Sequence, residues 1–154
     1  ETAAKDEILH AKLLQELAEQ EGEFVPSVKY KPSQKDIFEV ALHNAVEGCV
    51  HETWSALIAN WQSAHLEEDP DLCIIYHKIG QDETNHGQLA WDLHHWFLSQ
   101  LTKNQQKTIK KSQQQAIARL LINNGNMEYI AGLGLPTTQQ AQMLTSIFCA
   151  ELVA

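Results

Sequence analysis

Residues 82–93 read DETNHGQLAWDL, and residues 6–17 read DEILHAKLLQEL. Both segments fit one pattern, Asp-Glu-x-x-His-x-x-Leu-x-x-acid-Leu. On an α-helix, residues i and i+3 project from one face about one turn apart, so each copy offers a carboxylate beside an imidazole. Helical bundles hold two metal ions with a Glu-x-x-His from each of two helices and a single Glu from each of two others. The repeat therefore predicts a helical bundle with an internal metal site.

The remaining pattern is helical throughout, so the expected fold class is all-α. An extended connection is expected over 22–32 and a glycine-containing connector over 127–136. Predicted caps are Ser33 with Asp36, Asp69 before Pro70, Thr102 with Gln105, and Thr137 with Gln140. The expected helices cover residues 3–21, 33–64, 70–101, 102–125 and 137 to near the C-terminus.

Composition narrows the classes of function. The chain has 154 residues, enough for one domain with a real core, and a formal net charge of −9, which argues against nucleic acid as a partner. Lysines at 103, 107, 110 and 111 are expected to form a solvated helix face. Three cysteines without CxxC spacing predict no disulfide framework. No run is apolar enough for a membrane span. The cytoplasm is favoured, with the periplasm as the alternative because a targeting segment could precede the first motif.

Glu83 occupies the middle of an apolar stripe. Burying its charge unpaired would cost several kcal/mol or more, and a divalent metal would offset that cost. The alternatives are a buried Glu–His hydrogen-bonded pair, or a helix rotated so that the pair is wet. The apolar residues within about 80° of Glu83 on an ideal helix are Leu72, Tyr76, Ile79, Ala90, Leu93, Phe97 and Leu101.

A third carboxylate is expected from the helix between the two copies, which offers Glu47 and Glu52. Counting from a hairpin turn near residues 67 and 68 puts Glu52 level with Glu83, and Glu47 about 7.5 Å further from the turn. Glu52 shares its face with small residues (Ala41, Ala45, Gly48, Ala56, Ala59), and Glu47 shares its face with large ones (Val50, Trp54, Leu57, Ile58, Trp61). A narrow face lets helices approach closely, and the large residues could pack on later helices. Glu52 is the first choice and Glu47 the second.

Asp6 and Asp82 each precede a motif histidine by four residues. Ligating histidines usually donate their second ring N–H to a carboxylate or carbonyl group. We expect each Asp to orient a site histidine, with a solvent-facing acid as the alternative. The histidines outside the repeat are expected to be surface or core residues; they are His43, His51, His65, His77, His94 and His95.

These segments resemble the ferritin-like superfamily, and most of all bacterial ferritin-like domain proteins with a Glu-Gly-Cys-x-x-Glu-Thr segment between two Asp-Glu-x-x-His helices. Here that segment is residues 47–53, and the resemblance covers about residues 5–101. It implies a four-helix-bundle core over 1–101, with two C-terminal helices over 102–154 packed on the same domain. It also implies Glu7, His10, Glu83 and His86 as ligands, with Glu52 or Glu47 between them.

The resemblance implies two iron ions, with manganese or zinc as alternatives, and oxidase, oxygenase or peroxide-reducing chemistry. Catalytic residues beyond the ligands are not indicated. The family has a further Glu-bearing helix before the first motif, and this sequence opens directly on the motif. That helix was removed, belongs to another chain, or is missing from an incomplete site. The competing hypothesis is therefore a non-catalytic interaction module that binds a partner helix, and either hypothesis predicts an oligomer or a complex.

Overall fold

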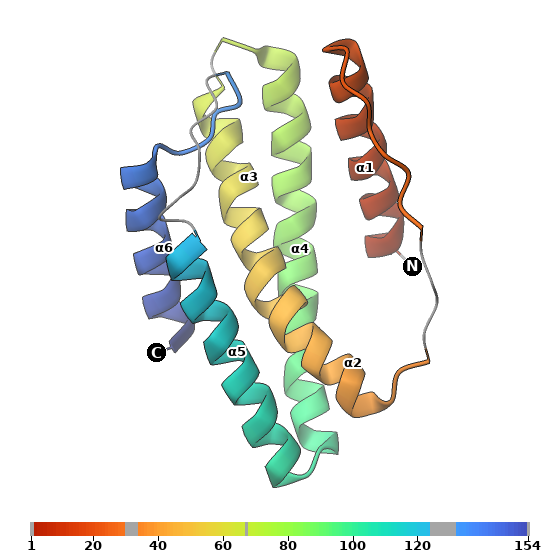
Figure 1. Ribbon diagram of the computed structural model, residues 1–154, viewed down its shortest axis with the longest axis vertical. Coiled ribbons are helices and arrows are strands. Elements are labelled where there is room, and N and C mark those ends of the chain that lie inside the picture. The colour runs from red at the N-terminus through yellow and green to blue at the C-terminus, as the bar shows by residue number, and fades with distance from the viewer. Residues whose placement is uncertain (1, 30–33, 67, 124–131, 154) are drawn as a thin grey trace. The chain divides into compact units, whose positions relative to one another are not determined.

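The computed structural model describes residues 2–29, 34–66, 68–123 and 132–153. The chain divides into two compact units, Glu1–Lys35 and Asp36–Ala154. Within the described residues every regular element is a helix and none is a strand (Figure 1). The expectation of an all-α protein is confirmed. None of the described helices combines the length and apolar composition that a membrane span requires.

The first unit is built on one helix, α1 (Thr2–Gln20), which agrees closely with the helix predicted over 3–21. The turn after the helix contains Gly22, whose φ of 82° lies in the left-handed region that favours glycine. The Glu23 amide then donates to the Ala18 carbonyl at 2.9 Å, which satisfies one of the last carbonyl groups of the helix.

The second unit begins with one long helical rod made of α2 (Ile37–His43), η1 (Asn44–Glu52) and α3 (Thr53–His65). Asp36 caps it, since its side chain accepts from the Glu39 amide at 2.8 Å and Glu39 accepts from the Asp36 amide at 2.9 Å. The predicted cap at Ser33 lies outside the described residues. The helix begins at Ile37 because Asp36, with Glu39 three residues later, forms the reciprocal box.

The other three predicted caps are confirmed. Asp69 accepts from the Leu72 amide at 3.0 Å and opens α4 (Pro70–Gln100) with Pro70 in the first turn. Thr102 exchanges hydrogen bonds with Gln105 before α5 (Lys103–Asn123), and Thr137 does so with Gln140 before α6 (Thr138–Val153). The predicted end of the fourth helix at residue 125, and residues 127–131 of the connector, fall outside the described residues.

The middle of the rod departs from the expectation of a continuous α-helix, because η1 is a π-helix nine residues long. Its hydrogen bonds run from residue i to i+5, so each turn holds more residues than an α-turn. The residues before and after η1 therefore do not share one series of 100° steps around the helix axis. Beyond residue 52, the helix faces predicted from α-helical periodicity are rotated.

Large and small residues of the rod face different neighbours. Val50 and Trp54 pack with Ile117 and Leu120 of α5 and with Cys149 of α6, and the Trp54 and Phe148 rings meet edge to face at 5.3 Å. Ala41 and Ala45 instead pack with Phe97, Leu101 and Ile109. The expectation that the large residues pack on the later helices is confirmed. The second unit therefore contains α5 and α6 together with the rod and α4.

Candidate metal centre

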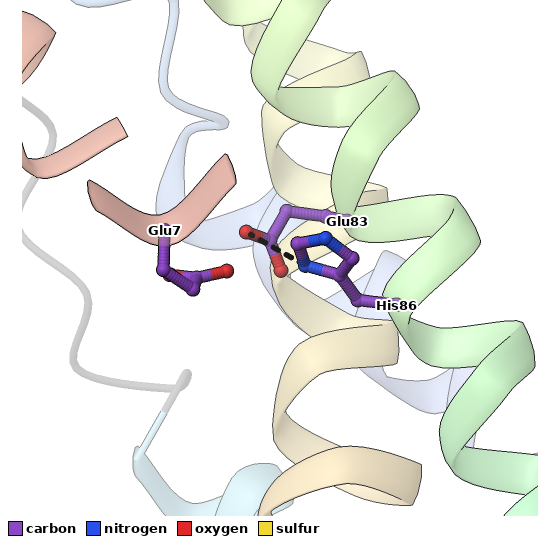
Figure 2. A group of neighbouring side chains, drawn as sticks. All are labelled: Glu7, Glu83 and His86. Atoms are coloured by element: carbon purple, nitrogen blue, oxygen red, sulfur yellow. Dashed lines mark ion pairs between the residues drawn. The ribbon is translucent and has the colours of Figure 1, made fainter. Parts of the chain in front are cut away.

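Glu83 and His86 lie on neighbouring turns of α4, and their side chains project to the same side (Figure 2). The Glu83 Oε1 and His86 Nδ1 atoms are 4.0 Å apart, and the two side chains are only 10% and 7% exposed. A carboxylate and an imidazole are thus paired on a buried face. Of the alternatives, the one in which a rotated helix leaves the pair wet does not describe this structure.

Two glycines on α4 let the rod approach this pair closely. A Cβ on Gly80 would lie 2.9 Å from the side-chain amide of Asn60, and one on Gly87 would lie 3.1 Å from Thr53 Oγ1. Asn60 Nδ2 uses that closeness to donate to the Gly80 carbonyl at 3.1 Å. Gly80 stands one turn before Glu83 and Gly87 directly follows His86, so the glycines hold the backbone of α4 against the rod at both ends of the pair.

A second polar contact ties α4 to η1. Asn44 Nδ2 donates to the Ala90 carbonyl at 2.9 Å, and the Cys49 thiol donates to the same oxygen at 3.5 Å. Burial and the nearby Glu52 carboxylate raise the pKa of Cys49 to about 12. Without a metal ion beside it, the thiol therefore stays protonated at neutral pH. Asn44 and Asn60 were not identified as contact residues from the sequence. The signal that could have identified them is their position among small residues on the rod.

Asp82 is buried, and Lys78 one turn earlier donates to its Oδ2 at 2.6 Å. The alternative of a solvent-facing acid does not hold for Asp82. Its predicted role of orienting a histidine remains a prediction, because the contact with Lys78 neither requires nor prevents it.

The two candidates for the third carboxylate differ in their surroundings. Glu47 is about half exposed and its Oε2 lies 2.8 Å from His51 Nδ1. Glu52 is partly buried beside Cys49. Among the described residues, neither joins Glu83 and His86 in a group whose ligand atoms all lie within 4.8 Å of one another. The π-helix places these two acids, five residues apart, about one turn from each other, whereas an α-helix would separate them to different faces.

The contacts across the hairpin also change the expected position of Glu52 along the axis of the helix pair. Asn60 opposes Gly80 and Thr53 opposes Gly87, so the next residue, Glu52, continues opposite Gln88. Glu52 therefore lies nearer to the level of His86 than to that of Glu83, from which it is about 7.5 Å along the helix. The turn lies a few residues later than the count from 67 and 68 assumed.

The first copy of the motif lies in the other unit, on α1. Glu7 Oε1 and His10 Nδ1 are 3.8 Å apart, and the Glu7 side chain is 57% exposed. Asp6 is partly buried. The α-helical spacing thus pairs carboxylate with imidazole in both copies.

The remaining histidines have local contacts. Nδ1 of His65 lies 2.8 Å from the Trp61 carbonyl oxygen, and Nδ1 of His95 lies 2.7 Å from that of Trp91. His77 Nε2 lies 3.0 Å from the Gln81 amide nitrogen, and His43 is exposed. His94 differs from them because it is buried.

The donor set of the second unit suits a divalent metal ion in kind. Glutamate oxygen and neutral imidazole nitrogen are ligands that iron, manganese and zinc accept. Two such ligands are too few for a closed metal site. Comparisons with family models, with curated proteins and with solved structures find no match for this chain.

Proposed function

We propose that this chain is a di-metal carboxylate protein of the ferritin-like kind, with iron as the first choice of metal and O2 or a peroxide as its substrate. One observation carries the proposal: a carboxylate and an imidazole share the buried face of α4, 4.0 Å apart, in a segment whose sequence recurs on α1. Without a cation, the free-energy cost of removing the Glu83 carboxylate from water would have to be offset by other interactions.

In this proposal Glu83 and His86 form one half of the ligand set, and Glu7 with His10 forms the other half. Glu52 or Glu47 adds a carboxylate from the rod. Iron, when bound, would supply the redox chemistry with O2 or peroxide. The chain supplies anionic oxygens that offset the metal charge, neutral imidazole nitrogens, and close helix packing that excludes water. The support for the Glu7–His10 half is the duplicated sequence and the matching pairing within α1.

The test is metal content after anaerobic addition of ferrous iron and removal of the excess. Wild type should retain tightly bound iron by elemental analysis. Glu83→Ala and His86→Ala should each abolish tight binding while helical content by circular dichroism stays mostly intact. Asp92→Asn is the matched control, since Asp92 is an exposed acid on the same helix bonded to Gln88. Unchanged iron in both site variants would place any metal site elsewhere.

Glutamine substitutions separate the two candidates on the rod, because each keeps the shape of the side chain and removes its charge. We expect the larger loss of iron from Glu52→Gln, since Glu52 is the more buried of the two and lies near the level of His86. Glu47→Gln should change metal content less and should break the contact with His51. Loss at Glu47 with normal loading of the Glu52 variant would reverse the assignment.

A second candidate function is an interaction module that binds a partner helix. The observation that favours it is an exposed apolar row on α4, made of Leu89, Leu93 and Trp96 at i, i+4 and i+7, which are 48%, 38% and 52% exposed. Size-exclusion chromatography with light scattering tests it. A dimer or complex that Trp96→Gln disrupts would support this function, and a stable monomer would count against it.

A further inference from the structure

A cavity of about 360 Å³ lies where α4 and α5 diverge. Its lining includes His94 and Leu98 from α4, and Lys103, Lys107, Lys110 and Gln113 from α5. His94 follows Glu83 by eleven residues, which is about 16 Å along a helix. The cavity therefore belongs to a different part of the second unit from the candidate metal centre, and it falls within the size range of small-molecule sites.

The hairpin between the two helices is fixed, so the cavity has firm walls. Gln106 Nε2 donates to the Leu98 carbonyl at 2.7 Å and to the Leu101 carbonyl at 3.0 Å, which ties the start of α5 to the end of α4. Ile109 is 1% exposed and packs with Phe97 and Leu101 on the side of α2. Leu98, which is partly exposed, supplies the apolar wall that faces the cavity, and the buried Ile109 lies at its lining.

The rim of the cavity is positively charged although the chain as a whole is acidic. Lys103, Lys107 and Lys110 follow one another at i, i+4 and i+7, so they share one face of α5. No acidic residue occurs within Lys103–Asn123, and none lines the cavity. The first turn of α5 adds the positive end of a helix dipole. The local field therefore favours an anion in a protein whose net charge is −9.

Two buried nitrogens of this region have no hydrogen-bond partner among the described residues: His94 Nδ1 and Gln113 Nε2. His94 is 7% exposed, and burial, followed by the neighbouring His95, lowers its pKa. His94 is thus neutral at pH 7. Leaving a bare lone pair unpaired costs less than leaving an N–H unpaired, so the proton belongs on Nε2. His94, a lining residue of the cavity, then carries one N–H donor.

We infer that this cavity binds a small organic anion with an apolar body, such as a medium-chain aliphatic carboxylate. The lysine row and the His94 N–H would hold the anionic group, and Leu98 with the aliphatic stems of the lysines would cover the apolar part. A bare inorganic anion would leave the apolar walls unused, and an uncharged alcohol would leave the lysine row unpaired. The inference is independent of metal binding.

Isothermal titration of the whole chain with octanoate, 1-octanol and inorganic phosphate tests the inference at physiological salt. Octanoate should bind saturably at one site per chain, and more tightly than 1-octanol or phosphate. Lys107→Gln combined with Lys110→Gln should weaken octanoate about five-fold or more, since two ion pairs are removed. Lys111→Gln is the matched control, because it removes the same charge from the same helix and does not line the cavity; it should change affinity less than about two-fold.

His94→Leu tests the donor separately, because it keeps an apolar side chain of similar size and removes the N–H. It should weaken octanoate while leaving helical content unchanged by circular dichroism. Absence of saturable octanoate binding overturns the inference. Equal binding of 1-octanol would show an apolar cavity without anion recognition, and equal binding of phosphate would show that the apolar walls play no part. Equal weakening by Lys111→Gln would mean that the lysines act only through the overall charge of the helix, and this result would also overturn the inference.

Discussion

The two copies of the Asp-Glu-x-x-His motif have nearly the same sequence and different surroundings. In the second copy, Gly80 and Gly87 flank the motif, and the rod packs against both. The positions that correspond to them in the first copy hold Ala4 and Ala11 on a helix that forms its own compact unit. Glu83 is 10% exposed, whereas Glu7 is 57% exposed.

The comparison separates what the motif determines from what its neighbours determine. The i, i+3 spacing pairs a carboxylate with an imidazole in both copies, at 3.8 Å and 4.0 Å. The two histidines are equally buried, and the copies differ in the exposure of the carboxylate. In the second copy the flanking glycines admit the rod beside Glu83. A duplicated motif can therefore keep its local pairing while its two carboxylates differ in access to water.

The largest expected effect comes from disabling the first copy, because the proposal assigns both copies to one ligand set. Glu7→Ala combined with His10→Ala should abolish tight iron binding, as Glu83→Ala and His86→Ala should. Elemental analysis of the loaded proteins measures the effect. If the first-copy variant keeps all its iron, the second copy binds metal without it, and the likeness between the copies is one of sequence alone.

The closed packing around the second copy should also appear in thiol reactivity. Cys49 is fully buried against Ala90 with a pKa of about 12, burial raises the pKa of Cys149, and Cys73 is only partly buried. At pH 8, iodoacetamide should label Cys73 about ten-fold or more faster than Cys49, since the thiolate is the nucleophile. Mass spectrometry of tryptic peptides gives the rates, and in guanidinium the three rates should converge. Rapid labelling of Cys49 in the folded protein would mean that η1 opens readily.

A smaller effect is expected from filling the contact between η1 and α4. A Cβ on Gly48 would lie 2.6 Å from the Ala90 Cβ, and both atoms are attached to backbone, so helices must shift. Gly48→Ala should lower the free energy of unfolding by about 1–3 kcal/mol through overpacking, partly offset by about 1 kcal/mol of helix propensity. Urea unfolding measures the change. Adding Ala90→Gly should restore most of the loss; failure of that rescue would place the strain elsewhere.

The smallest effect concerns His94, further along the same helix. Because its folded pKa lies below the unfolded value, the unfolded state binds more protons at acidic pH. The stability from neutral His94 is present above the unfolded pKa and is lost as pH falls towards the folded pKa. His94→Gln should therefore lose less stability than wild type between pH 7.5 and 5.5. Titratable groups near it are His95 and the lysines of the cavity. Parallel pH curves for the two proteins would contradict this prediction.

Local sequence predicted much of the fold, because helix ends depend on a few adjacent residues. Asp69 with Pro70, and Thr102 with Gln105, each satisfy backbone amides within their own turn, so their pattern alone sufficed. The π-helix could not be predicted in the same way. Its wide turn is stabilised by contacts with distant residues, such as that of Asn44 with the Ala90 carbonyl, which no local pattern encodes.

The candidate site shows the same division. The Glu83–His86 pair followed from spacing and from its apolar stripe, both of which belong to a single helix. The position of Glu52 depended on where the hairpin turns and on the helical period, and both differed from the assumed values. The cavity beside His94 was not predicted, because it depends on how far two helices diverge.

The π-helix also affects how the rod would tolerate changes in length. A π-turn corresponds to an α-helix carrying one extra residue, so removing a single residue from 44–52 could convert η1 into ordinary α-helix with little displacement of α3. The same deletion within Thr53–His65 would rotate the residues beyond it by about 100° and separate Asn60 from Gly80. Among natural variants of this chain, gaps should therefore collect in η1 and be rare in α3.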